Sequence, residues 1–142
     1  MIHIRRILYA TDFSSYSNQA YFHAVSLAKA HQATLVIVYV YDPNQADLPS
    51  PPSGQSAVDY WREQLEQIRP LDDSIPVEHH LLIGEPATEL VAFTRQHPFN
   101  LVVMGTHGRT GLDRLLLGSV AEQMLRESPC SVLVVKIPQS QR

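Results

Sequence analysis

The sequence predicts an α/β fold in which an open, parallel five-stranded sheet carries helices on both faces. Two patterns indicate it: five short apolar segments alternate with four segments of helical periodicity, and the second apolar segment is almost wholly β-branched or aromatic. Such alternation is typical of parallel strands joined by right-handed helical crossovers. With 142 residues, 44% of them hydrophobic, the chain can build its own core, and we expect residues 1–142 to form one domain.

The first three elements are predicted from apolar runs and from the residues that end them. Residues 6–11 (RILYAT) favour a strand, and residues 12–15 (DFSS) supply side chains that cap the start of a helix. Small and apolar residues then recur at helical spacing between residues 18 and 31. Residues 33–41 (ATLVIVYVY) indicate a central strand that is buried on both faces.

A proline-rich segment and a second strand and helix follow. Residues 43–55 hold four prolines and one glycine, which predicts a mobile surface connector, with a lid over a site as the alternative. We expect a helix over residues 56–68 and a strand over residues 77–83. The turn at residues 84–86 (GEP) then predicts a helix over residues 87–96.

The last part of the chain places a glycine-rich segment between a strand and a helix. Residues 101–104 (LVVM) are purely apolar, as in a buried parallel strand, and the next fourteen residues contain four glycines. Gly118-Ser119 open a helix that ends at Ser128-Pro129. Residues 131–136 (SVLVVK) predict the fifth strand.

Composition argues against several functional classes. The net charge of −3 lacks the basic excess of nucleic-acid-binding proteins, so we expect no nucleic-acid partner. No apolar run approaches the roughly 20 residues of a membrane helix, and the N-terminus does not resemble a signal peptide, so we expect no membrane association. The single cysteine, Cys130, cannot form an intrachain disulfide, which indicates a reducing cytoplasm.

The glycine-rich segment is the strongest indication of a ligand. Its glycines leave backbone N–H groups uncovered, and the helix that opens at Gly118 directs the positive end of its dipole to the same place. We expect Ser119 to cap this helix and, with the amide of Val120, to donate hydrogen bonds to a phosphate. Arg109 and Arg114 are candidates for additional positive charge. The Walker lysine and the glycines of a dinucleotide fingerprint are absent, which argues against the commonest NTPase and dehydrogenase sites.

A second strand end completes the predicted site. In an open parallel sheet, the ligand crevice lies outside the carboxyl ends of the strands, where the strand order reverses. Asp12 follows the first strand, where a carboxylate can accept hydrogen bonds from a ribose or base, or contact a metal ion bound to phosphates. The alternative is that Asp12 caps the first helix. No sequence neighbour suggests a catalytic partner for His107, and the adjacent His79 and His80 point to opposite faces of a strand, so we expect neither catalytic residues nor a metal cluster.

The spacing of these residues resembles the nucleotide signature of the universal stress protein family. That signature is Gly, two residues, Gly, nine residues, Gly, then Ser or Thr. The matching residues are Gly105, Gly108, Gly118 and Ser119. Residues 7–14, 84–86 and 129–135 are also similar to this family, so the resemblance covers nearly the whole chain.

The resemblance implies a Rossmann-like sheet of the adenine nucleotide alpha hydrolase-like type, with strand order 3-2-1-4-5. It also implies membership of the branch that binds ATP or AMP, with Mg²⁺ as the candidate ion that would accompany ATP. The implied phosphate contacts are Gly108, Gly118, Ser119 and Val120. The remaining implied pocket residues are Gly105 at the ribose, Asp12 and Val40 at the adenine end, and Thr11 and Met104 along the wall.

The family also pairs two chains through the last strand. The apolar run Val132–Val135 suits such pairing, so we expect a homodimer. The function implied is that of a cytoplasmic stress-response protein whose nucleotide occupancy sets a regulatory or partner-binding state, with weak hydrolysis at most. One alternative is a slow ATPase or self-phosphorylating enzyme that uses Asp12 to hold a metal and Ser119 near the γ-phosphate. The other is a dimeric adaptor that needs no nucleotide.

Overall fold

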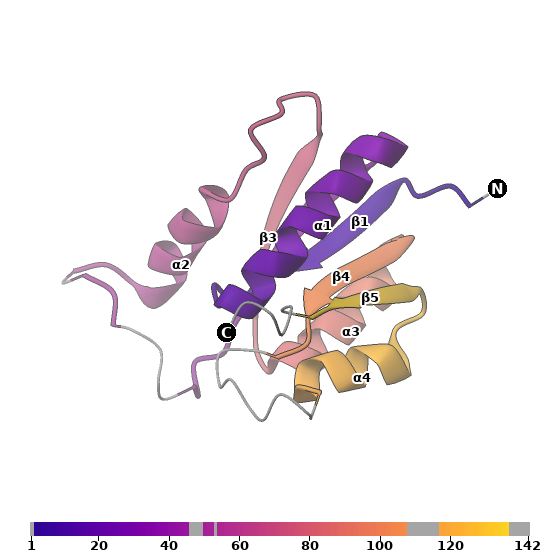
Figure 1. Ribbon diagram of the computed structural model, residues 1–142. Coiled ribbons are helices and arrows are strands. Elements are labelled where there is room, and N and C mark those ends of the chain that lie inside the picture. Colours follow the sequence, from indigo (N-terminus) through magenta and orange to yellow (C-terminus); the bar gives the residue numbers. More distant parts are fainter. Residues whose placement is uncertain (1, 46–49, 53, 108–116, 137–142) are drawn as a thin grey trace.

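Five parallel strands form the sheet in the spatial order β3-β2-β1-β4-β5, as predicted (Figure 1). The computed structural model describes residues 2–45, 50–52, 54–107 and 117–136. The strands are β1 (Arg6–Ala10), β2 (Thr34–Tyr41), β3 (Val77–Ile83), β4 (Leu101–Gly105) and β5 (Ser131–Val135). Because β1 pairs with β2 on one side and with β4 on the other, the strand order reverses at the carboxyl end of β1.

Two helices cover each face of the sheet, which confirms the predicted layering (Figure 1). The helices α1 (Ser15–His31) and α2 (Ala57–Glu66) pack on one face. The helices α3 (Pro86–Gln96) and α4 (Ser119–Glu127) pack on the other, against each other and the sheet. None of the helices in the described residues is both long and apolar enough to cross a membrane.

The central strand β2 contributes to both hydrophobic layers. Successive side chains of a strand point to opposite faces, so alternate residues of β2 enter different layers. Those facing α1 and α2 are Leu35, Ile37 and Tyr39. Those facing α3 and α4 are Val36, Val38 and Val40. All six are buried, which confirms the prediction of a strand enclosed on both faces.

The helix α1 lies close to the sheet because small residues form its inner stripe. Ala20, Ala24 and Ala28, each four residues apart, are almost completely buried. The helix begins at Ser15, three residues before the predicted start, because the Ser14 hydroxyl accepts a hydrogen bond from the N–H of Ser17. The predicted capping residues therefore include the true N-cap.

Other boundaries differ from prediction by one or two residues. The helix α3 begins at Pro86 because the carboxylate of Glu85 accepts hydrogen bonds from the amides of Ala87 and Thr88. The helix α2 is shorter than predicted at both ends, and β4 extends to Gly105. Cap residues and hydrogen bonds to the neighbouring strand decide where these elements end. The periodicity of the side chains carries no information on these ends.

Candidate functional site

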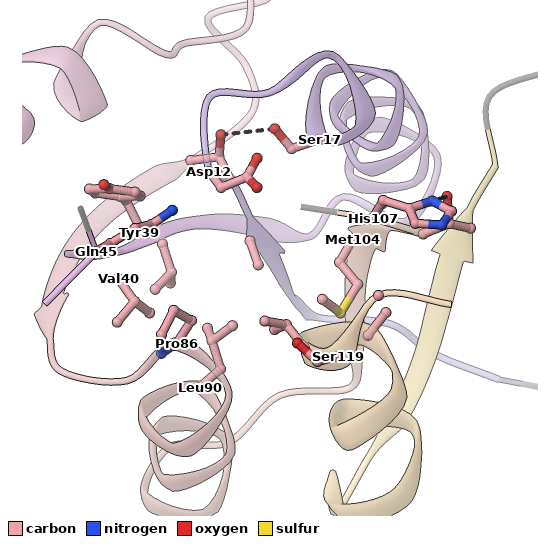
Figure 2. A pocket seen from close by; sticks show the side chains of 18 residues that line it. Asp12, Ser17, Tyr39, Val40, Gln45, Pro86, Leu90, Met104, His107 and Ser119 are labelled. Atoms are coloured by element: carbon pink, nitrogen blue, oxygen red, sulfur yellow. Dashed lines mark hydrogen bonds between the residues drawn. The ribbon is translucent and has the colours of Figure 1, made fainter. Parts of the chain in front are cut away.

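A pocket lies at the carboxyl ends of β1, β2 and β4, where the sheet topology predicts the ligand crevice (Figure 2). Its volume of about 180 Å³ is more than ten times what one buried water requires, so an organic group fits inside it. Eight of the ten predicted site residues line it: Thr11, Asp12, Val40, Met104, Gly105, Gly118, Ser119 and Val120. The other two, Gly108 and Arg109, lie outside the described residues, as does Arg114.

The turn after β1 directs Asp12 to the pocket. The N–H of Thr11 continues the sheet by donating to the carbonyl of Val38 at 2.9 Å. The Asp12 Oδ1 accepts the N–H of Ser14 at 3.0 Å, so the alternative in which Asp12 caps α1 is wrong, because Ser14 occupies that position. Within the described part of the chain, no donor reaches the second carboxylate oxygen, Oδ2, which leaves an acceptor for a ligand.

The aromatic ring of Phe13 anchors this turn to the core. The Phe13 φ of +65° lies in the left-handed region, which costs a non-glycine residue roughly 1–2 kcal/mol. The ring packs against Tyr39 and Trp61, with centroid separations of 4.8 Å and 5.1 Å, and this burial offsets the cost. Sequence patterns contain no signal for this anchor, because only the folded core brings the three rings together.

Below the turn, buried hydroxyl groups join β1 to the first turn of α1. The Tyr9 hydroxyl donates to the carbonyl of Ser17 at 2.7 Å, and burial raises the pKa of Tyr9 to about 12. The Ser17 hydroxyl donates its proton to the carbonyl of Ser14. The Thr11 hydroxyl, 3.3 Å from the Ser17 hydroxyl, is therefore the donor in the contact between them (Figure 2). Sequence analysis missed Ser17 as a pocket residue, since it occupies an ordinary inward position on a helix.

The opposite side of the pocket presents the open N-terminus of α4. The N-cap is Gly118, not Ser119, because Gly118 has extended backbone angles while Ser119 is the first helical residue. The side chains of Ser14, Ser56 and Glu85 cap the other three helices, whereas Gly118 has no side chain to do so. Among the described residues, no acceptor therefore reaches the first-turn amides of Ser119 and Val120, which line the pocket.

The floor between these two sides requires a glycine at the end of β4. A Cβ atom on Gly105 would lie 2.6 Å from the carbonyl oxygen of Tyr16, at the start of α1. The next residue, Thr106, accepts the N–H of Gly118 at 2.7 Å through its carbonyl, and its own N–H donates to Val135. These bonds hold the N-terminus of α4 beside the ends of β4 and β5.

An apolar wall faces the α4 side across the pocket. Figure 2 shows Val40, Pro86 and Leu90 on this wall, with Met104 nearer to Ser119. Sequence analysis identified Val40 and Met104 but missed Pro86 and Leu90. The glycine-glutamate-proline turn predicted the start of α3, but the sequence contains no signal that the first turns of α3 border the pocket.

The charges around the pocket are few in the described residues. Asp12 is the one acidic lining residue, and no lining residue there is Lys or Arg. His107 is buried, with its Nδ1 3.1 Å from the Thr106 hydroxyl and its ring 5.2 Å from that of Tyr16. The described residues contain no cluster of three or more His, Cys, Asp or Glu that could hold a metal ion. The arrangement combines hydrogen-bond donors at one end with an apolar surface at the other.

Comparisons with known proteins agree with this fold. Residues 3–136 match the model of the universal stress protein family. The curated relative MJ0531, a universal stress protein of Methanocaldococcus jannaschii, is 36% identical, over 96% of this chain and 85% of the relative. The solved structure of MJ0577 from the same organism has a TM-score of 0.75 at 25% identity, covering 97% of this chain and 99% of its own.

A universal stress protein solved in complex with cAMP shares the fold. Its TM-score is 0.68 at 24% identity, and the match covers 94% of this chain and 98% of that protein. The family model spans nearly all of the sequence that the structure describes, and the relative MJ0531 matches along the same length. The chain therefore belongs to the universal stress protein family.

Proposed function

We propose that this chain binds an adenine nucleotide, ATP or AMP, and that occupancy of the pocket sets a regulatory or partner-binding state in a cytoplasmic stress response. The observation that carries the proposal is the two-ended character of the pocket. Open backbone amides at the start of α4 lie across from an apolar wall formed by β2 and α3. A nucleotide has the same two-ended character, with an anionic phosphate and a flat, largely apolar base.

The phosphate end of the proposed site is the N-terminus of α4. The amides of Ser119 and Val120 and the hydroxyl of Ser119 supply donors, and the helix dipole favours negative charge there. Gly118 lets the phosphate approach the backbone closely. We assign further phosphate contacts to Gly108 and Arg109, and the ribose region to Gly105.

The base end is the apolar wall that contains Val40, and Met104 lines the pocket between this wall and Ser119. Thr11 closes this part of the pocket, and the Oδ2 atom of Asp12 is available to accept a hydrogen bond from the ribose or the base. When the ligand is ATP, the same carboxylate is the candidate ligand for a Mg²⁺ ion on the phosphates. The complex of a universal stress protein with cAMP supports this choice of ligand class.

We propose that the pocket holds its nucleotide rather than consuming it rapidly. Phosphoryl transfer needs positive charge around the transferring group and a residue that positions the nucleophile. Arg109 would supply positive charge, but no residue of this sequence has the context of a base that positions the nucleophile. Turnover of ATP by the purified protein, well above that of a Ser119→Ala variant, would instead support the slow ATPase or self-phosphorylating enzyme.

The Ser119→Ala variant is expected to bind AMP about tenfold more weakly than the parent, because it loses one hydrogen bond to a charged group. Isothermal titration of ligand-free protein measures this change. The matched control is Ser26→Ala, which removes an exposed hydroxyl from α1 away from the pocket and leaves affinity unchanged. Absence of AMP and ATP binding by the parent protein would contradict the proposed function, as would recovery of a different ligand class on denaturing freshly purified protein.

We also propose that two copies pair through β5, an edge strand of the sheet. The carbonyl of Val135 accepts the N–H of Thr106, so the alternation of a strand places the N–H of Val134 on the outer edge. The Val134→Pro variant, which lacks this N–H, is expected to be monomeric in light scattering, while Val134→Thr remains dimeric. A monomeric parent protein at micromolar concentration would contradict this pairing.

A further inference from the structure

One polar side chain reaches the pocket from the loop that follows β2. Gln45 is partly buried and lines the pocket beside Tyr39 and Val40, on the far side from Ser119 (Figure 2). It carries the only carboxamide among the described lining residues. The proline-rich sequence of this loop predicted a connector or a lid and gave no signal for Gln45.

A hydrogen-bonded turn positions Gln45 relative to the sheet. The N–H of Gln45 donates to the carbonyl of Asp42 at 3.1 Å, and the N–H of Asn44 donates to Asp42 Oδ1 at 2.9 Å. Pro43 occupies the second position of this turn, where its restricted φ is favourable. Gln45, four residues after the end of β2 at Tyr41, is therefore still hydrogen-bonded to the residue that follows the strand, so the start of the predicted mobile connector is an ordered turn.

The surroundings of Gln45 suit the edge of a flat heterocycle. Val40, Pro86 and Leu90 supply apolar surface on the same side of the pocket, and a buried ring must still satisfy the polar atoms on its edge. The ionised carboxylate of Asp12 only accepts hydrogen bonds. The carboxamide of Gln45 both donates and accepts.

That pairing of donor and acceptor is what adenine requires. Each polar edge of adenine places the N6 amino donor next to a ring-nitrogen acceptor, and the side-chain amides of Asn and Gln pair with such an edge in protein–DNA complexes. An acceptor-only group can satisfy the amino group but repels the neighbouring ring nitrogen. Gln45 thus supplies a donor and an acceptor on one side chain at the base end of the pocket.

We propose that Gln45 contacts the base edge of the bound nucleotide and determines base specificity at this pocket. The inference rests on the proposed function, because it takes the phosphate to lie at α4 and the base at the opposite wall. It goes further in assigning base recognition to a side chain outside the family signature. The backbone N–H groups of Asn44 and Gln45 hold the turn to Asp42, so loss of the Gln45 carboxamide changes the ligand contact and leaves the turn's hydrogen bonds in place.

The test compares AMP, IMP and ribose 5-phosphate on ligand-free protein by calorimetry and by competition. Gln45→Ala is expected to weaken AMP binding about tenfold and to leave ribose 5-phosphate unchanged, since only AMP carries the base. Gln45→Glu is expected to shift the ratio of AMP to IMP affinity at least about tenfold toward IMP. A carboxylate accepts the N1–H of hypoxanthine but has no donor for the ring nitrogen of adenine.

Gln64→Glu is the matched control, because it makes the same change in charge on α2 at a residue that does not line the pocket. It should leave the AMP-to-IMP ratio unchanged. A parent protein that binds AMP while both Gln45 variants keep the parent affinities overturns the inference alone, as does a parallel loss of ribose 5-phosphate binding. A parent protein that binds none of the three ligands overturns the proposed function first. Circular dichroism of each variant verifies that the fold is intact.

Discussion

The Gly105→Ala variant is expected to lose about 1–3 kcal/mol of unfolding free energy and most of its nucleotide affinity. The added Cβ would lie 2.6 Å from the carbonyl oxygen and 2.8 Å from the carbonyl carbon of Tyr16, both backbone atoms that no rotamer change can move. The first turn of α1 must therefore shift. That turn carries Ser17, which is hydrogen-bonded to the pocket residue Thr11, so the wall of the pocket moves with it. Denaturant unfolding and AMP titration measure the two losses.

Gly54→Ala is the control that separates collision from backbone strain. Gly54 has a φ of +85°, so alanine is strained there, but a Cβ at this position has open space around it. We expect Gly54→Ala to cost roughly 1 kcal/mol through the backbone and to leave AMP binding intact. If Gly105→Ala proves no more destabilising than Gly54→Ala, and retains its AMP affinity, the close contact between β4 and α1 is not the reason for the glycine.

The Phe13→Ala variant is expected to lower the unfolding free energy by about 3 kcal/mol, because it removes an aromatic ring packed between Tyr39 and Trp61. Phe13→Gly should be the more stable of the two truncated variants by roughly 1 kcal/mol, since glycine adopts the positive φ of this position without strain. Both variants should bind AMP more weakly, because the turn that orients Asp12 loses its anchor. Guanidinium unfolding of the three proteins in parallel tests the ranking.

The relative unfolding free energies of Phe13→Ala and Phe13→Gly test whether the backbone at residue 13 is strained. Phe13→Ala and Phe13→Gly lose the same ring contacts, so their difference reports the backbone at residue 13. An alanine variant more stable than the glycine variant would show that residue 13 does not hold a left-handed conformation in solution. Unchanged stability in both would show that the ring does not anchor the turn.

Secondary structure was largely predictable, because the signals for it are local. The apolar run of β2 predicted burial on both faces, and the serines after Asp12 predicted a capped helix. The errors lie at element ends. Ser119 was expected to cap α4, but Gly118 takes that position, since the cap is decided by backbone angles that a Gly-Ser pair does not specify. Asp12 instead accepts the N–H of Ser14 within the turn.

The pocket residues were predictable where the glycine spacing, the end of the first strand or the family resemblance indicated them. The glycine spacing identified Gly105, Gly118 and Ser119 because it lies within fifteen residues of sequence, and the structure places these three on the pocket. Pro86, Leu90 and Gln45 come from other elements and follow no signature. They reach the pocket because the sheet order sets the ends of β1, β2 and β4 side by side.

By itself, the sequence determined the α/β class, the alternation of elements and the glycine spacing that resembles the family signature, because periodicity and glycine spacing act over a few neighbouring residues. The tertiary structure decided the contacts that make a pocket of the glycine-rich segment. Among these are the close approach of Tyr16 to Gly105, the strained anchor at Phe13 and the presence of Gln45 on the far wall. Each of these depends on atoms distant in the chain that meet only when the sheet has formed, and no local pattern encodes such a meeting.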